Sequence, residues 1–154
     1  MHVWDPASGA YKRSLQGHVK GVFSISFCAS FRMLVTAGFE HDLLVWNLND
    51  TRPVQRLVGH KASLIGVGVA RGDTASPQIV SAATDGCIKV WDFVRWTTLQ
   101  TFFCEGGDWR VPPIPPAPRD ATPFRVTAFA VFDEPHFSRV VVAGGKHLLS
   151  LIHI

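Results

Sequence analysis

The chain of 154 residues is long enough for one domain of ordinary size, and 47% hydrophobic against 18% charged residues supply a packed core. Its apolar runs are short and separated by turn-forming residues, so none approaches the roughly 18 residues that a membrane-spanning helix needs. The net charge of +3 comes from scattered basic residues rather than from the concentrated stripe of a nucleic-acid footprint. We therefore expect a soluble, folded protein with no membrane partner and no nucleic-acid partner.

The N-terminal sequence and the cysteines point to the cell interior. Residues 1–6 have neither the basic start nor the apolar stretch of a secretory signal. Cys28, Cys87 and Cys104 are odd in number and lie far apart, so they form neither a disulfide framework nor a zinc-binding pair. We expect an intracellular, cytoplasmic protein without a cofactor, whose thiols are reduced and packed as small apolar residues.

The predicted elements are short strands, because runs of β-branched and large apolar residues alternate with turn formers and no segment shows sustained helical periodicity. In chain order, the expected strands are 2–5 and 11–15, then 21–27, 33–37, 43–47 and 54–57, then 64–70, 78–82, 87–92 and 98–103, and finally 125–133, 139–144 and 148–154.

An internal period of about 42 to 45 residues organises these strands. Two Gly-His pairs and three tryptophans mark this period, and each set gives the same spacing. The pairs are Gly17-His18 and Gly59-His60, and the tryptophans are Trp4, Trp46 and Trp91. Because two kinds of marker agree in register, the repeat is a specific signal, whereas a single Trp-Asp pair would mean little.

Four short antiparallel strands per period, with Gly-His near the start and Trp-Asp near the end, resemble a blade of the WD-repeat β-propeller family. The resemblance covers essentially the first 104 residues. It implies an all-β fold, an incomplete propeller of about three to three and a half four-stranded antiparallel blades. The expected divisions are 1–16, the end of a preceding blade; 17–58, the first full blade; 59–104, the second full blade; 105–124, a proline-rich inserted loop; and 125–154, a degenerate, truncated third blade.

The resemblance also implies a chain of side-chain hydrogen bonds in each blade, from the tryptophan through a hydroxyl and the histidine to a turn carboxylate. By position, the first full blade supplies Trp46, Thr36, His18 and Glu40, and the second supplies Trp91, Ser81, His60 and Asp85. Their donor and acceptor capacities suit this order. We expect a complete chain in the second blade, whereas the extra methylene of Glu40 puts the last bond of the first blade in question.

Catalysis and metal binding are the alternatives for His18 and His60. Their place at the repeat marker explains both residues structurally, and the remaining histidines show no regular ligand spacing. No paired carboxylates stand in an acid/base setting. We therefore predict no catalytic residue, no metal site and no enzyme. Gly66 and Gly68 lie in an apolar strand without a following helix, so close approach near the propeller axis explains them better than a phosphate loop.

Six of the ten prolines lie between residues 112 and 123, which predicts an extended or polyproline II segment outside any sheet interior. We interpret this segment as a stiff loop between blades. The alternative is a docking loop for an SH3 or WW domain, with PxxP spacing at Pro112, Pro115 and Pro118 and a flanking Arg119.

The resemblance predicts a non-catalytic scaffold whose loops and blade faces hold protein or peptide partners, which the sequence does not identify. The alternative is a regulatory or targeting propeller region of a larger enzyme, or of a motor or ciliary-type assembly, whose active domain lies outside these residues. We also expect the remaining blades of the same propeller from the parent chain, because the open sheet edges otherwise invite pairing.

Overall fold

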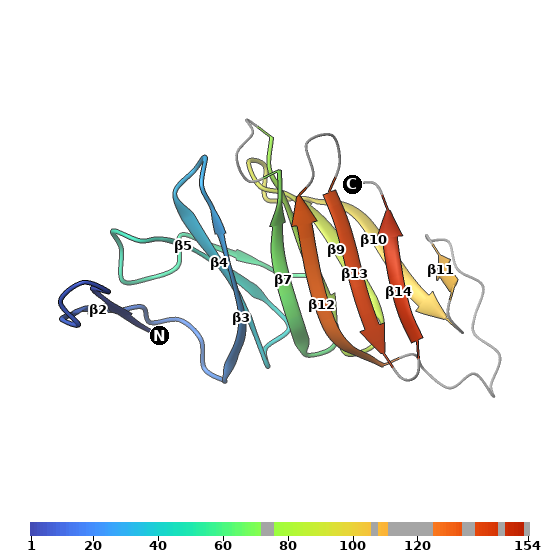
Figure 1. The fold of residues 1–154 in the computed structure, drawn as a ribbon, viewed down its shortest axis with the longest axis horizontal. Coiled ribbons are helices and arrows are strands. Elements are labelled where there is room, and N and C mark those ends of the chain that lie inside the picture. Colours follow the sequence, from blue (N-terminus) through green and yellow to red (C-terminus); the bar gives the residue numbers. More distant parts are fainter. Residues whose placement is uncertain (72–75, 106–107, 111–124, 134–137, 145–146, 153–154) are drawn as a thin grey trace.

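All regular structure among the residues that the computed structural model describes is β-strand. The structure describes residues 1–71, 76–105, 108–110, 125–133, 138–144 and 147–152. The strands form four antiparallel sheets, which follow one another along the molecule (Figure 1). Within these ranges, no helix is long and apolar enough to cross a membrane.

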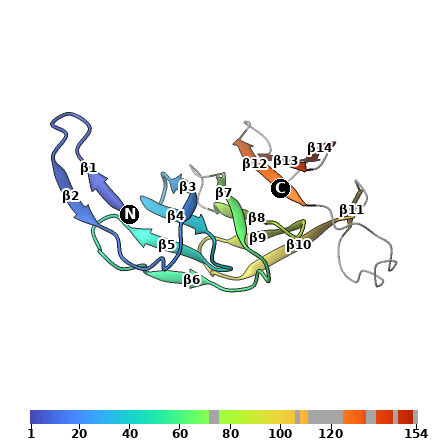
Figure 2. The same cartoon turned by 90° about the horizontal axis from the view of Figure 1, so that it is seen from below.

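The first full blade is a sheet of four antiparallel strands in sequence order, β3-β4-β5-β6. Its strands are β3 (Val22–Cys28), β4 (Met33–Gly38), β5 (Leu43–Asn47) and β6 (Gln55–Leu57). Two strands precede it, β1 (His2–Trp4) and β2 (Tyr11–Ser14), and they pair only with each other. Figure 2 shows this two-stranded sheet at one end of the molecule. These bounds lie within a residue or two of the predicted strands.

The second full blade has one strand more than predicted. Its sheet order is β11-β10-β9-β8-β7. The strands are β7 (Leu64–Ala70), β8 (Gln78–Ala83), β9 (Cys87–Asp92), β10 (Thr98–Glu105) and β11 (Asp108–Arg110). Within the predicted proline-rich loop over 105–124, the backbone of β11 pairs with β10, with Phe103 opposite Arg110. A third sheet holds β12 (Val126–Asp133), β13 (Ser138–Gly144) and β14 (His147–Ile152).

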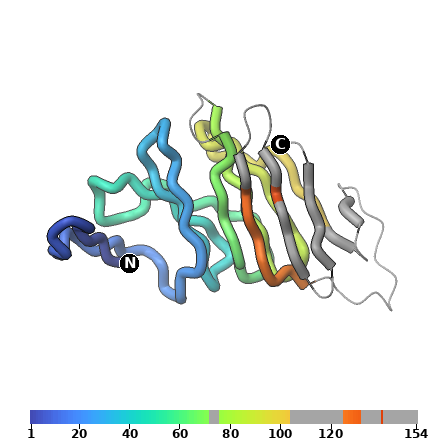
Figure 3. The backbone as a smooth tube through the Cα atoms, viewed as in Figure 1, coloured from blue at the N-terminus to red at the C-terminus, as the bar shows by residue number. Residues whose placement is uncertain are grey.

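The inner strands β3, β7 and β12 lie side by side and join the three larger sheets (Figure 1, Figure 3). Between β3 and β7 the contact is polar as well as apolar. The Val67 N–H donates to Ser24 Oγ at 3.1 Å, and the Val69 N–H donates to Ser26 Oγ at 2.9 Å. Two serine hydroxyls on one inner strand therefore bind the backbone of the next.

One apolar core continues across the first two blades. Its buried members come from both sheets and include Val35 and Val45 of the first blade and Val67 and Ile79 of the second. Burying a side chain of this size stabilises a fold by roughly 1.5 to 3 kcal/mol. The two blades therefore form one packed unit rather than two independent sheets.

Two glycines of β7 give room for β12. A Cβ atom added to Gly66 would lie 2.5 Å from Phe129 Cδ1, and one added to Gly68 would lie 2.3 Å from Val131 Cγ2. Real Cβ contacts are not this short, so any side chain at either position displaces β12. Close packing between neighbouring inner strands accounts for both glycines.

We predict that Gly68→Ala lowers the free energy of unfolding by about 1 to 3 kcal/mol, because the new methyl group overpacks the interface with Val131. Urea denaturation of the two proteins measures this difference. Gly21→Ala is the matched control, since a Cβ there lies 3.4 Å from the Phe39 ring, an ordinary contact. Equal effects of the two substitutions would contradict the packing described here.

Candidate functional site

The first full blade contains an unbroken chain of side-chain hydrogen bonds. The buried indole Nε1–H of Trp46 donates to Thr36 Oγ1 at 2.9 Å, and His18 Nε2 lies 2.6 Å from the same hydroxyl. His18 Nδ1 bonds to a carboxylate oxygen of Glu40. One arrangement satisfies every group: the Thr36 hydroxyl donates to Nε2, and Nδ1–H donates to Glu40.

The carboxylate of Glu40 does more than end this chain. Its second oxygen accepts the backbone N–H of Val19 at 2.5 Å and that of Lys20 at 2.7 Å. Burial by itself raises the pKa of the Glu40 carboxyl, but the bonds from the Lys20 N–H, the His18 ring and the Val19 N–H outweigh it and hold the pKa below its usual value. Glu40 thus fixes the segment that leads into β3.

In the second blade the chain ends at the histidine. Trp91 Nε1–H donates to Ser81 Oγ at 2.8 Å, and His60 Nε2 lies 2.7 Å from that oxygen. Among the described residues, none bonds to the buried Nδ1 of His60. Asp85 is exposed, and its carboxylate accepts the Cys87 N–H at 3.1 Å instead.

The side chain at the turn explains why the expected difference between the blades is reversed. Glu40 and Asp85 stand at equivalent places, four residues after Thr36 and Ser81 in their own blades. The Asp85 side chain bonds within its own turn, and it lacks the methylene that helps Glu40 reach the histidine. The prediction that Asp85 completes the second blade's chain is therefore corrected, and Glu40 is the carboxylate that bonds to its histidine.

The glycine of each Gly-His marker lies against the ring of the blade's tryptophan. A Cβ atom added to Gly17 would lie 2.8 Å from Trp46 Cη2, and one added to Gly59 would lie 3.0 Å from Trp91 Cη2. The glycine lets the chain pass close to the indole, and the histidine that follows reaches the hydroxyl behind it. This geometry accounts for the pairing of glycine with histidine.

We expect Glu40→Ala to lower the free energy of unfolding by about 1 to 3 kcal/mol, because three donors lose their acceptor. Asp85→Ala removes one partly buried turn bond, and we expect it to cost less than about 1 kcal/mol. Chemical denaturation of both variants measures the difference. An Asp85→Ala variant as unstable as Glu40→Ala would show that Asp85 does bond to the network.

His60 also predicts a dependence of stability on pH. Burial, with smaller contributions from the charges of Lys89 and His41, lowers the pKa of His60 from 6.5 to about 3. The unfolded chain binds a proton at this residue below pH 6.5 and the folded chain does not, so stability falls as the pH drops from 6.5 toward 3.

We predict that His60→Gln removes this contribution, because glutamine retains hydrogen-bonding groups and does not titrate. Between pH 6 and pH 4, the stability of the unsubstituted protein should fall more steeply than that of the variant, by up to about 1.4 kcal/mol per pH unit. Thermal unfolding across this range measures both slopes. Parallel slopes would mean that His60 takes up its proton equally in the folded and unfolded states.

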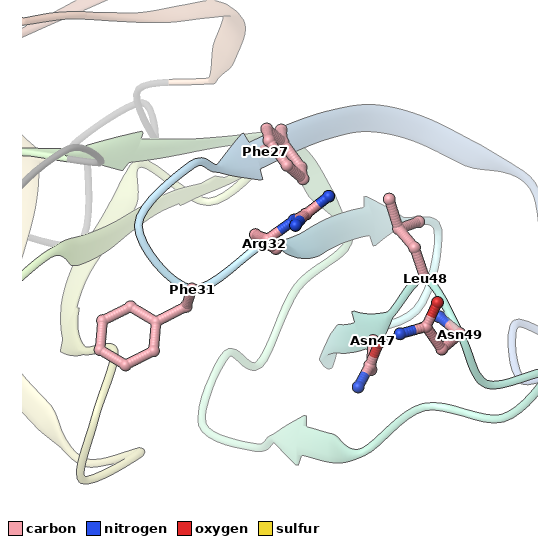
Figure 4. A pocket seen from close by; sticks show the side chains of 6 residues that line it. All are labelled: Phe27, Phe31, Arg32, Asn47, Leu48 and Asn49. Atoms are coloured by element: carbon pink, nitrogen blue, oxygen red, sulfur yellow. Dashed lines mark hydrogen bonds between the residues drawn. The ribbon is translucent and has the colours of Figure 1, made fainter.

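The sequence did not reveal a pocket at one end of the first blade, between the turn from β3 to β4 and the end of β5. It has a volume of about 410 Å³ and is lined by Phe27, Phe31, Arg32, Asn47, Leu48 and Asn49. Figure 4 shows the Arg32 side chain beside Phe27, with Leu48 and the two asparagines on the neighbouring segment. Pairing of Met33 with Asn47 brings these segments together, so the sequence offers no local signal for the pocket.

Two features mark the turn that carries this pocket. Arg32 has a positive φ of 52°, a conformation that costs energy for a residue with a side chain. The ring of Phe31 stacks on Phe93 of the second blade, with 5.4 Å between centroids and 26° between planes. The contact between blades therefore holds the turn in place and presents Arg32 at the surface.

The predicted docking loop for a protein partner, with Pro112, Pro115, Pro118 and Arg119, lies outside the described residues. In the part of the chain that is described, no group of three or more histidines, cysteines, aspartates or glutamates is arranged to hold a metal ion. The candidate site residues are those of the two hydrogen-bond chains inside the blades and of the surface pocket around Arg32.

Successive antiparallel sheets, joined through inner strands that lie side by side, define part of a β-propeller. The sequence pattern of the WD40 family (WD domain, G-beta repeat) matches residues 9–47 and 51–92. The chain belongs to this family, and the predicted all-β, incomplete propeller is confirmed.

Relatives and a solved structure agree with this assignment. Cilia- and flagella-associated protein 337 B of Tetrahymena thermophila is 31% identical over 106 residues, which are 69% of this chain and 8% of that protein. Autophagy-related protein 16 of Arabidopsis thaliana is 30% identical over 92 residues, 60% of this chain and 18% of that protein. The structure of U3-55K matches 97% of this chain and 44% of its own, with a TM-score of 0.68 and 18% identity. The chain thus spans a small part of these relatives.

Proposed function

We propose that this chain is a non-catalytic module that holds protein or peptide partners, located in the cytoplasm. The WD40 family is in general a non-catalytic interaction module, which supports the non-catalytic, partner-binding role. The free, buried thiol of Cys87 supports an intracellular location, because thiols persist there. The observation that carries the proposal is the surface pocket around Arg32.

The pocket has the composition of a protein contact. Phe27 and Phe31 are exposed by 49% and 39%, so they offer apolar surface to a partner. Among the described residues, no carboxylate pairs with the guanidinium of Arg32. Aromatic residues and arginine carry much of the binding energy at protein interfaces. We therefore propose a partner segment with an apolar side chain and a neighbouring carboxylate or carbonyl group.

A second proposal keeps the chain within a larger assembly. Its similarity to a cilia- and flagella-associated protein, of which it spans 8%, favours a regulatory or targeting propeller region of a ciliary-type assembly. In that setting the pocket binds another component of the assembly. Binding partners recovered from ciliated cells distinguish this proposal from a general scaffold.

We predict that Arg32→Gly abolishes partner binding and leaves the fold intact, because glycine adopts a positive φ without strain. The measurement is affinity capture with the full-length protein, followed by titration of each recovered partner in purified form. Arg71→Gly is the matched control, since Arg71 is exposed and has the same backbone conformation, with φ of 53°.

A partner whose affinity falls at least tenfold with Arg32→Gly and stays unchanged with Arg71→Gly supports the pocket as its site. Equal affinity for both variants would place binding elsewhere on the chain. Recovery of background proteins alone by the full-length protein would count against the scaffold function itself.

A further inference from the structure

A second pocket lies at the end of the second blade and has a volume of about 260 Å³. Its lining includes Pro77, Gln78, Asp92, Val94, Arg95 and Leu99. It stands at the same place in the repeat as the pocket around Arg32, because Gln78 pairs with Asp92 as Met33 pairs with Asn47. In both blades the pocket therefore lies where the second strand begins and the third strand ends.

Two stacked rings connect the two pockets. Phe31 lines the first pocket, and its ring points away from Arg32 (Figure 4) and stacks on Phe93 with 5.4 Å between centroids. Phe93 is 1% exposed, and its chain neighbours Asp92 and Val94 line the second pocket. The pockets are therefore neighbours and form one surface, the pocket rim. Two small pockets joined by a ring suit single side chains of an extended segment better than the flat face of a folded domain.

The backbone holds both pockets in a fixed shape. Arg32 lines the first pocket with a φ of 52°, and Trp96, which follows Arg95 of the second, has a φ of 61°. Residues with side chains keep such a conformation only where the surrounding structure imposes it. Phe93 does so here, because its ring lies 5.2 Å from that of Trp96 and also stacks on Phe31. A site that is already formed loses little entropy when a ligand binds.

The second pocket combines apolar surface with an amide oxygen that lacks a donor. Val94 and Leu99 are exposed by 52% and 48%. The buried Oε1 of Gln78 has no hydrogen-bond partner among the described residues. An unpaired buried acceptor is unfavourable, and the loosely defined last torsion of glutamine lets it turn toward a donor in the pocket. An apolar side chain and a main-chain N–H group of a bound peptide match these two features.

The charges of the pocket rim favour an acidic segment. The carboxylate of Asp92 accepts the N–H groups of Val94 and Arg95 at 2.7 and 2.8 Å. It also accepts a guanidinium N–H of Arg95 at 3.0 Å, so its charge is largely compensated. Among the described residues, no carboxylate pairs with Arg32. The guanidinium of Arg32 is therefore available to a carboxylate of the bound segment.

We propose that one extended peptide segment of a partner lies across both pockets. It places an apolar side chain in each pocket and a carboxylate beside Arg32, and one of its main-chain N–H groups donates to Gln78. Alternate side chains of an extended chain point to the same side, about 7 Å apart, so the two apolar residues stand at an even spacing. The inference rests on the proposed binding of a partner at the first pocket, and it adds the second pocket and the form of the partner.

The test begins with a selection of peptides. Random linear peptides of about 12 residues, displayed on phage, are selected against the full-length protein, because an extended chain of this length spans roughly 40 Å. Each selected peptide is then synthesised with a fluorescent label, and its Kd is measured by fluorescence polarisation. We expect acidic peptides with two apolar residues at an even spacing.

Substitutions in the second pocket test its part in binding. Leu99→Ser removes apolar surface, and Gln78→Met removes the amide at a similar side-chain length. We expect each to weaken binding of the selected peptides by about fivefold or more. Val58→Ser is the matched control, since Val58 is 68% exposed and lines neither pocket. Thermal unfolding of each variant checks that its fold is retained.

A double-mutant cycle identifies the peptide residue that occupies the second pocket. Replacing one of the two apolar peptide residues by alanine should make binding insensitive to Leu99→Ser, because the contact is already lost. Arg32→Gly should still weaken binding of the same alanine peptide. This pattern supports a segment that spans both pockets.

Other results would overturn the inference. Peptides that lose affinity with Arg32→Gly but bind both Leu99→Ser and Gln78→Met unchanged would confine binding to the first pocket, and the proposed function would stand alone. Peptides unaffected by Arg32→Gly would remove the first pocket and both proposals with it. A selection that yields no binding peptide would exclude an extended segment, as would a stable dimer that Leu99→Ser dissociates. Partners captured through Arg32 would still support the proposed function in that case.

Discussion

The rest of the structure depends on the buried indole N–H groups of Trp46 and Trp91. Each side chain has a single donor and almost no exposure, so an acceptor must lie inside the blade. A hydroxyl on the neighbouring strand provides it, and the histidine of each Gly-His pair reaches the same oxygen. A slip of one residue in strand pairing would turn the hydroxyl to the other face of the sheet. This interaction therefore couples strand register to the position of the segment that leads into each blade.

The end of each hydrogen-bond chain shows how the side chain at the turn governs the network. Glu40 holds its histidine and two backbone N–H groups at once, so the first blade is closed at this corner. The buried Nδ1 of His60 instead has no partner among the described residues, and the ring stays neutral because burial lowers its pKa. A carboxylate therefore holds His18 in the first blade, whereas His60 in the second blade is buried and neutral. The contribution of His60 to stability is the one that falls in acid.

Packing between inner strands converts separate sheets into a single body and also creates the surfaces available for binding. Gly66 and Gly68 of β7 admit larger side chains of β12. The stacking of Phe31 on Phe93 fixes the turn that exposes Arg32. Contacts between blades therefore also position the residues of the surface pocket.

The sequence by itself determined the repeat and most strand positions, because side-chain alternation and turn formers are local properties. Its resemblance to the WD-repeat family implied the tryptophan, hydroxyl and histidine of each hydrogen-bond chain. The tertiary structure decided which carboxylate bonds to its histidine, since that depends on the reach of the turn side chain and on the path of the chain around His18 and His60. It also decided that Gly66 and Gly68 lie against β12 and that Arg32 lies in a pocket. These contacts join residues far apart in the sequence, and no local pattern records such distances.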